Sequence, residues 1–263
     1  MNNMKLLFNQ RIIALVLTAA LAGCNNNGHD EEKDDLPEAP DTIKTSVLNV
    51  KGELFSVPSP VQAAILIQKS GIPYNKGWLN HSNKVNTYST DYSRALNLGI
   101  YGADLGYVSL FGQTQDALGY LASIKQLSDK LGVSSAFDAA TMDRIKNNIT
   151  NKDSMMVLVG LAYRASDAYL KDNKRTDISG LILAGGWIES LHFSVMALHA
   201  KPSDQLRFRI AEQKQALQSI IKLLGGMSLG GAPELRTKLE DLAKVEKAPS
   251  LEGKRMSAML APK

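Results

Sequence analysis

The sequence predicts an all-α fold, a single bundle of about seven to eight mostly antiparallel helices that follows a disordered tether. Three observations lead to this prediction. Apolar residues recur at helical spacing after residue 58, runs of alternating β-branched residues are scarce, and the stretches between the expected helices are short. A chain of this length can bury a substantial core. We therefore expect one helical domain over residues 58–263.

The first three helices are predicted from the residues at their ends. Proline is favoured in the first turn of a helix and glycine just past the last one, so Pro60 and Gly71 bound a short first helix. After a loop rich in asparagine, Thr90 can cap a long second helix that runs to about Leu110. The third helix follows over residues 113–131 and ends at a glycine.

The later helices are predicted to begin at residues whose side-chain oxygens accept backbone N–H groups: Ser134 or Ser135, Asp153, Asp177 and Ser203. These helices run to about residues 148, 170, 200 and 224. Pro233 begins a final polar helix that extends to about Lys247. Outside the helices, only residues 47–57 can hold a short strand.

The first 23 residues have the composition of a secretory signal peptide. Lys5 and Arg11 form a positive segment, and residues 12–21 form an apolar run that is too short to span a bilayer. The run Leu21-Ala22-Gly23-Cys24 then resembles the lipobox of bacterial lipoproteins. In that family the cysteine thiol receives a diacylglyceryl group, the signal peptide is cut before it, and the new amino group is usually acylated. The resemblance implies that fatty acyl chains such as palmitate anchor the protein at Cys24.

Cys24 is the only cysteine in the chain, and lipidation would account for its isolation. A thioether-linked lipid uses the thiol, so no disulfide can form in the mature chain and stability must come from a core. One acyl chain holds a protein only marginally, whereas two or three chains anchor it firmly. The alternative is an ordinary signal peptide followed by a chance cysteine.

The lipidated cysteine and an acidic, flexible tether are expected to occupy residues 24–57. The acidic run Asp-Glu-Glu-Lys-Asp-Asp at residues 30–35 is a solvated spacer in the simplest interpretation. It also resembles the surface-export signal of lipoproteins in Bacteroidota-type bacteria. We expect the protein to be anchored in the outer membrane and exposed at the cell surface, with a periplasm-facing location as the alternative.

The folded part of the chain is mildly basic. The whole chain has 30 Lys and Arg and 26 Asp and Glu. The signal peptide holds two of the basic residues, and the tether through Asp41 holds one basic and seven acidic residues, which leaves 27 basic against 19 acidic residues. No basic cluster is interleaved with aromatic residues. The composition therefore argues against a nucleic-acid partner.

The second helix carries three glycines in the segment NLGIYGADLGYVSLFG. Glycine costs about 1 kcal/mol in a helix interior relative to alanine, yet Gly99, Gly102 and Gly106 lie at spacings that share one face. Such a strip allows a second helix to approach closely, and the glycines before Trp187 in the sixth helix suggest the partner. The alternative is the floor of a ligand-binding groove, lined by Tyr101, Asp104 and Trp187.

Asp104 is unusual because it lies on a largely apolar helix. A buried carboxylate without a partner is costly, so we expect it to pair with a basic group or a hydroxyl. The candidate basic residues are Arg94, Arg144 and Arg164. The other interpretation is a catalytic or ligand-binding role.

The sixth helix contains a stripe of potential metal ligands. Glu189, His192 and His199 fall at helical offsets on one face, and Glu-x-x-His is the spacing used in di-iron helical bundles. Those sites need a second such pair, which the sequence lacks. A mononuclear metal or haem site remains an alternative, but one helix supplies too few ligands. We expect histidines with structural or surface roles and no cofactor.

The sequence leaves three classes of function open. It contains neither a Gly-x-Ser-x-Gly elbow nor a His-Glu-x-x-His motif. The leading class is therefore a non-enzymatic binding or accessory lipoprotein of the outer membrane or cell surface with a protein partner in the envelope. The second class is a lipoprotein that binds a ligand in a pocket beside the glycine strip over residues 99–106. The third is a metal- or haem-dependent enzyme that uses the stripe on the sixth helix.

The order of features resembles one group of known proteins. A lipobox and an acidic tether precede a helical domain with the segments PSPVQAAILIQKSGIPYN, LNLGIYGADLGYVSLFG and AGGWIES. This arrangement is similar to uncharacterised all-helical lipoproteins of Bacteroidota-type bacteria. The resemblance implies membrane placement and carries no activity or site residues with it.

Overall fold

The computed structural model describes residues 45–50, 53–58, 60–136, 139–227, 229–244, 251–252 and 255–256. All of these residues belong to one compact unit, Pro37–Lys263. The expected signal peptide, Cys24 and the acidic run lie outside the described residues.

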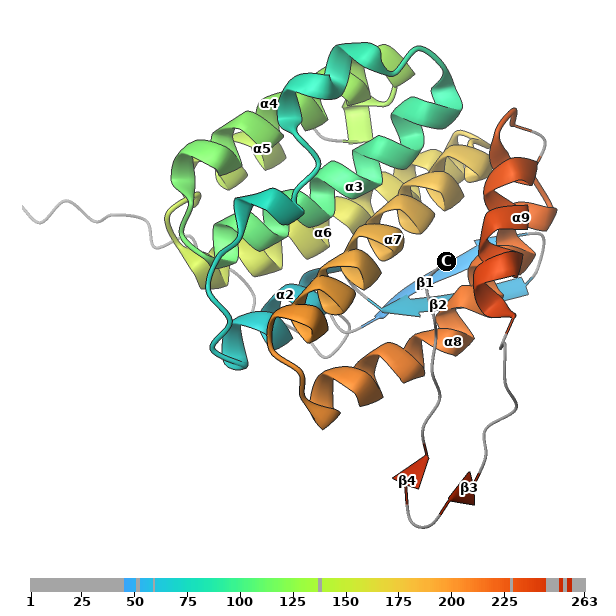
Figure 1. Ribbon diagram of the computed structural model, residues 1–263. Helices are drawn as coiled ribbons and strands as arrows, with labels where there is room; N and C mark the ends of the chain where they lie inside the picture. The colour runs from blue at the N-terminus through green and yellow to red at the C-terminus, as the bar shows by residue number, and fades with distance from the viewer. Residues whose placement is uncertain are drawn as a thin grey trace, which may run out of the picture. The chain divides into compact units, whose positions relative to one another are not determined.

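The described residues form an all-α bundle, as predicted (Figure 1). Its α-helices are α2 (Pro60–Lys69), α3 (Asp91–Leu110), α4 (Thr114–Leu131), α5 (Ala139–Asn147), α6 (Lys152–Asp172), α7 (Thr176–Ala200), α8 (Asp204–Gly225) and α9 (Ala232–Ala243). Short 3-10 helices span Lys76–Trp78, Ser82–Thr87 and Ser134–Ala136. Each of the eight α-helices overlaps a helix that the sequence predicts.

Most of the helix ends follow the capping residues in the sequence. The side chain of Thr90 accepts the Ser93 backbone N–H and the Ser93 side chain accepts the Thr90 N–H, so α3 begins with a capping box. Gly132 ends α4 in the left-handed conformation, which glycine adopts without strain. Ser203 caps α8 through its contact with the backbone N–H at position 206. These local contacts explain why the boundaries were predictable.

Three helix starts differ from the prediction. The cap of α6 is Asn151, whose side chain accepts the Ser154 N–H, and not Asp153, which lies within the first turn. Helix α7 begins without a side-chain cap, and Asp177 lies in its first turn, where a negative charge is favourable. Helix α5 begins at Ala139, after the 3-10 turn over 134–136.

A β-hairpin precedes the helices. Strands β1 (Thr45–Val50) and β2 (Glu53–Pro58) pair in antiparallel register, with Thr45 opposite Pro58. The expected short strand over 47–57 is therefore two strands. Strand β2 contacts α8 and α7. A second pair, β3 (Leu251–Glu252) and β4 (Arg255–Met256), follows the last helix.

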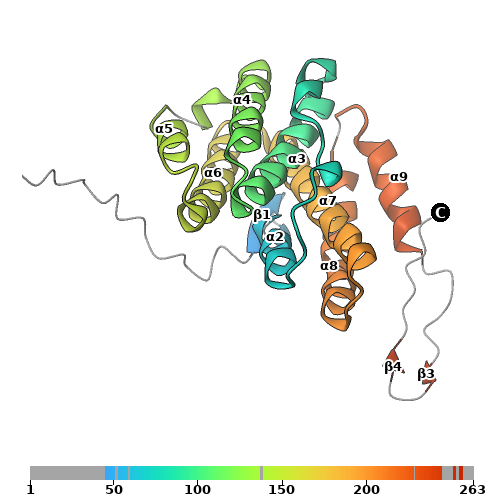
Figure 2. The same ribbon diagram turned by 60° about the vertical axis from the view of Figure 1, so that its left-hand side comes forward.

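Helices α3 and α7 form the centre of the bundle and lie side by side in both views (Figures 1 and 2). Helix α7 is the one described helix whose length and composition would allow it to cross a membrane, but 61% of its apolar 18-residue stretch is buried within the protein. A helix in the core of a protein can have the same length and apolar composition as a membrane-spanning helix. We therefore account for its apolar character by its contacts with α2, α3, α6 and α8.

The two central helices cross at glycines, as the sequence predicts. A Cβ atom at Gly99 would overlap the carbonyl oxygen of Ile182, and one at Gly185 would overlap the carbonyl oxygen of Leu96. The backbones of α3 and α7 are therefore in direct contact at this point. Gly102 has a different partner, because a Cβ there would overlap the hydroxyl group of Tyr163 on α6.

Candidate functional site

Residues 72–89 connect α2 to α3 in the sequence and run across the bundle. This segment is here called the strap. Hydroxyl groups of the core hold its backbone. Tyr101 donates to the carbonyl oxygen of His81 at 3.0 Å, and Tyr120 donates to that of Asn80 at 3.0 Å. The hydroxyl of Tyr107 accepts the backbone N–H of residue 75 at 3.1 Å. The strap is therefore fixed by buried tyrosines of α3 and α4.

Further contacts tie the strap to α4 and α7. The hydroxyl of Ser123 donates to the carbonyl oxygen of Ser82 at 3.0 Å. Nε2 of His192 lies 3.1 Å from the carbonyl oxygen of Trp78. Asp116 accepts hydrogen bonds from Tyr74 at 2.8 Å and from Lys76 at 2.6 Å. Two of the helices that support the strap, α3 and α7, also carry the carboxyl groups described next.

Two carboxyl groups meet beneath the strap. Asp104 on α3 is completely buried, with 0% exposure, and Glu189 on α7 is 7% exposed. Neither carboxylate oxygen of Asp104 has a hydrogen-bond partner of good geometry within the described part of the chain. A buried group of this kind is costly when it is ionised. The arrangement therefore favours the protonated form of Asp104.

The pair has strongly perturbed acidity. Burial raises the pKa of Asp104 well above its usual range, and the neighbouring Glu189 carboxyl raises it further, while the nearby Asn80 backbone partly offsets the rise. Burial also raises the pKa of Glu189 to about 7. Two carboxyl groups in contact cannot both ionise easily, so the pair retains a proton near neutral pH.

Asp104 has neither of the expected partners, a basic group or a hydroxyl, within the described residues, and that prediction is wrong. Arg94 instead donates to Asp91 at 3.1 Å and to the Tyr88 carbonyl oxygen at 3.2 Å. The charge that acts on Asp104 is the carboxyl of Glu189. Helix α7 presents an acid and not a base at this point because of its register against α3.

The tyrosines around the pair respond to the same environment. Burial raises the pKa of Tyr101, Tyr120 and Tyr163, and the charge of Asp104 adds to the rise in each case. These phenols therefore stay protonated and act as hydrogen-bond donors at neutral pH. The surroundings are chemically suited to holding a proton on the carboxyl pair, and complete burial of Asp104 separates that proton from solvent.

The three residues proposed to line a ligand pocket do not share one set of contacts. Tyr101 lies one turn from Asp104 and is bound to the strap. Trp187 is also buried, but its indole Nε1 donates to Oε1 of Gln213 on α8 at 3.0 Å. The structure thus places Tyr101 and Asp104 at the carboxyl pair and directs the polar edge of Trp187 toward α8.

The stripe of potential metal ligands is also divided. Glu189 is buried beside Asp104, whereas His192 is exposed and lies against the strap through Trp78. His199 is exposed near the end of α7. Among the described residues, no three His, Cys, Asp or Glu side chains converge in a way that could hold a metal ion. The helical spacing is present, but burial separates the glutamate from the two histidines.

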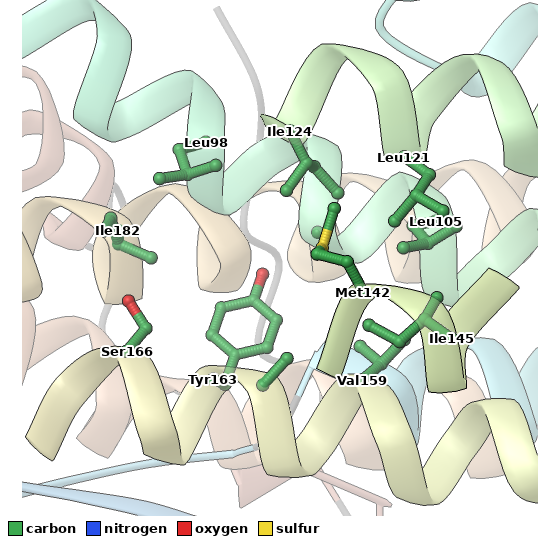
Figure 3. Close-up of a pocket in the computed structure, with 12 residues that line it drawn as sticks. Leu98, Leu105, Leu121, Ile124, Met142, Ile145, Val159, Tyr163, Ser166 and Ile182 are labelled. Carbon is green, nitrogen blue, oxygen red and sulfur yellow. The ribbon is translucent and has the colours of Figure 1, made fainter. Parts of the chain in front are cut away.

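An apolar cavity of about 30 Å³ lies beside Gly102 of α3 (Figure 3). Its lining comes from five helices: Leu98, Gly102 and Leu105 of α3, Leu121 and Ile124 of α4, Met142 and Ile145 of α5, Val159, Ala162, Tyr163 and Ser166 of α6, and Ile182 of α7. Tyr163 crosses toward α3 and donates to the carbonyl oxygen of Gly99 at 2.6 Å. The hydroxyl of Ser166 is buried and has no partner within the described residues.

The sequence indicated part of this arrangement. It singled out Asp104, Glu189 and the glycine strip, and it indicated that a pocket could open beside that strip. It did not indicate Tyr163 or Ser166, whose helix has ordinary amphipathic spacing. The one available signal was the small residues around them, in the segment GLAYRAS, because small side chains on a core helix leave room for a neighbour or a cavity.

Comparison with known proteins finds no matching family model, no similar curated protein and no similar solved structure. The site is therefore interpreted from its own geometry.

Proposed function

We propose that this chain is a lipid-anchored envelope protein whose helical domain acts by binding a protein partner at the outer membrane or cell surface, and not by catalysis. The observation that carries the proposal is the position of Cys24. It closes the run Leu-Ala-Gly-Cys directly behind a positive segment and a short apolar segment, and it is the only cysteine in the chain.

The packing of the domain supports this assignment. The described helix that is apolar enough to enter a bilayer, α7, is largely enclosed by other helices. Its apolar residues stabilise the core, so the proposal assigns membrane attachment to the lipid on Cys24. Two or three acyl chains anchor a protein without a transmembrane helix, because each buried methylene contributes about 0.8 kcal/mol.

Metabolic labelling with a clickable fatty acid tests the proposal. The wild-type chain should incorporate the label and partition with membranes, whereas Cys24→Ala should do neither. Lys5→Ala, which changes the signal segment without touching the thiol, is a control that should still be labelled. Label that persists on Cys24→Ala would contradict lipidation at this residue.

The location of the anchored domain can be measured in the same cells. We propose that the acidic run over residues 30–35 directs the protein to the outer face, where added protease would reach it. Replacing its five acids by alanine should keep the lipid label but protect the domain from external protease. Unchanged protease sensitivity would leave the run as a spacer only.

A further inference from the structure

The strap is attached to the bundle by few buried side chains. Most of its residues are exposed, and those with only 4–7% exposure are Ile72, Trp78, Leu79 and Val85. A segment with so few buried contacts opens locally at a lower free-energy cost than a packed core. The backbones of α3 and α7, in contrast, are in direct contact at their glycines. The strap is therefore the element at the carboxyl pair that can move most easily.

Two of the hydroxyl groups that hold the strap also lie in the electric field of the carboxyl pair. Tyr101 and Tyr120 each donate to a strap carbonyl oxygen at 3.0 Å, and the charge of Asp104 acts on both phenols. It also acts on Tyr163, which donates to a carbonyl oxygen of α3. A phenol has one proton to donate. While the strap is closed, these three donors are therefore committed to carbonyl oxygens and not to a carboxylate.

The closed strap suits a protonated carboxyl pair and not a fully ionised one. The backbone of Asn80 on the strap favours one negative charge on Asp104. A second charge on Glu189 would add repulsion between two groups that are both shielded from water. Opening of the strap would admit water and free two phenol donors. Hydrogen bonds to a charged acceptor are about twice as strong as those to a neutral one, so the open state favours ionisation.

We propose that the strap is a proton-controlled lid, which stays closed while the carboxyl pair holds its protons and opens locally when both carboxyls ionise. Opening then releases protons, so its equilibrium constant rises about tenfold per pH unit for each proton released. Burial raises the pKa of Glu189 to about 7 and that of Asp104 well above its usual range. The rise therefore falls mainly between pH 5 and 7. The inference is independent of lipidation at Cys24.

The other titratable groups that face the pair keep their charge in this range. They are the tyrosines of the strap, α3, α4 and α6, whose raised pKa values keep them protonated: Tyr74, Tyr101, Tyr120 and Tyr163. Asp116, which binds Lys76 of the strap, has a lowered pKa and stays ionised. Helix α2 has no charged side chain before its last residue.

Two histidines need a control, because histidine can change its charge in the same range. His192 on α7 contacts a strap carbonyl oxygen at 3.1 Å, and His81 is exposed on the strap itself. The double variant His81→Gln/His192→Gln keeps a polar side chain at both positions and removes both titrations. It should therefore keep the pH dependence of the wild-type chain.

Hydrogen–deuterium exchange of the full-length chain in detergent, read by mass spectrometry at pH 5, 6 and 7, tests the inference. After correction for the intrinsic exchange rate, protection of peptides within residues 72–89 should fall at least tenfold per pH unit. In Glu189→Gln this dependence should be smaller by about tenfold per pH unit. Peptides of α3 and α7 should stay more protected than the strap at each pH, because the opening is local.

Tyr120→Phe separates the strength of the lid from its control by protons. It removes one hydrogen bond to the strap and leaves both carboxyls, so protection should fall about fivefold at every pH with an unchanged slope. Equal protection of the wild-type strap at pH 5 and pH 7 would overturn the inference. So would an unchanged slope in Glu189→Gln, a flat profile in the histidine variant or in Tyr120→Phe, or equal protection of the strap and α3.

Discussion

Replacing Glu189 by glutamine removes one titrating group from the buried carboxyl pair and keeps the shape of the side chain. Burial raises the pKa of Glu189 from its ordinary value of 4.5 to about 7. Between these values the folded chain retains a proton that the unfolded chain has released. The contribution of Glu189 to the free energy of unfolding is therefore fully present below about pH 4.5 and is lost as the pH rises to about 7.

The size of the effect follows from the width of that interval. Each pH unit changes the free energy of unfolding by about 1.4 kcal/mol for one proton, so Glu189 accounts for a loss of about 3 kcal/mol across the interval. A typical domain has about 5–15 kcal/mol in total. Asp104 contributes in the same direction, because burial and Glu189 both raise its pKa. The variant Asp104→Asn/Glu189→Gln should therefore have the flattest profile.

Urea unfolding at pH 4.5, 5.5, 6.5 and 7.5 measures this slope. A buried amide adds a cost that does not vary with pH, so the slope, and not the absolute stability, is the informative quantity. Glu212→Gln, at an exposed position that pairs with Arg209, is a matched control and should keep the wild-type slope. The lowered pKa of Asp116, caused mainly by its hydrogen bond from Lys76, affects stability only below about pH 4. Equal slopes for wild type and Glu189→Gln would refute the reasoning.

Two further predictions concern the glycines of α3. Gly99→Ala should lower the free energy of unfolding, measured in urea, by about 3 kcal/mol or more, because its Cβ would overlap backbone atoms of α7. Gly106→Ala is the control and should be tolerated, because its Cβ would lie 3.6 Å from a valine methyl. Equal stabilities of Gly99→Ala and Gly106→Ala would contradict the close crossing. Gly102→Leu should lower the melting temperature by several degrees, since it displaces Tyr163, while Lys238→Leu should not; an unchanged melting temperature for Gly102→Leu would contradict this packing.

The helices of the bundle were predictable because their signals are local. Thr90, Gly132 and Ser203 act on backbone groups within three or four residues, so their roles can be recognised without the fold. The crossing of α3 and α7 was also predictable, since several glycines at helical spacing in two apolar helices are typical of a close helix crossing. The cap of α6 was less predictable, because Asn151 and Asp153 both offer an acceptor there and local sequence does not decide between them. The start of α7 was missed because it has no side-chain cap, so Asp177 lies in its first turn and does not mark its beginning.

The partner of Asp104 was not predictable for a different reason. A buried carboxylate calls for a basic group on energetic grounds, and arginines were present in three helices. The alternative, in which the carboxyl stays protonated beside a second acid, satisfies the same energetic requirement by changing its pKa. Only the relative register of two helices distinguishes these solutions. The cavity at Ser166 likewise depends on the packing of five helices at once.

The contacts between α3 and α7 show how the glycine crossing produces the carboxyl pair. Gly99 meets Gly186, Asp104 meets Glu189, and Tyr107 stacks on Phe193 at 4.7 Å, so the contacts advance in the same direction along both helices. These two helices therefore run parallel, although they are connected through three others. Because each residue advances a helix by about 1.5 Å, the acids lie only about 5–8 Å beyond the crossing. The close approach at the glycines thus holds the two carboxyl groups together, and substitutions there should change the pH slope as well as the stability.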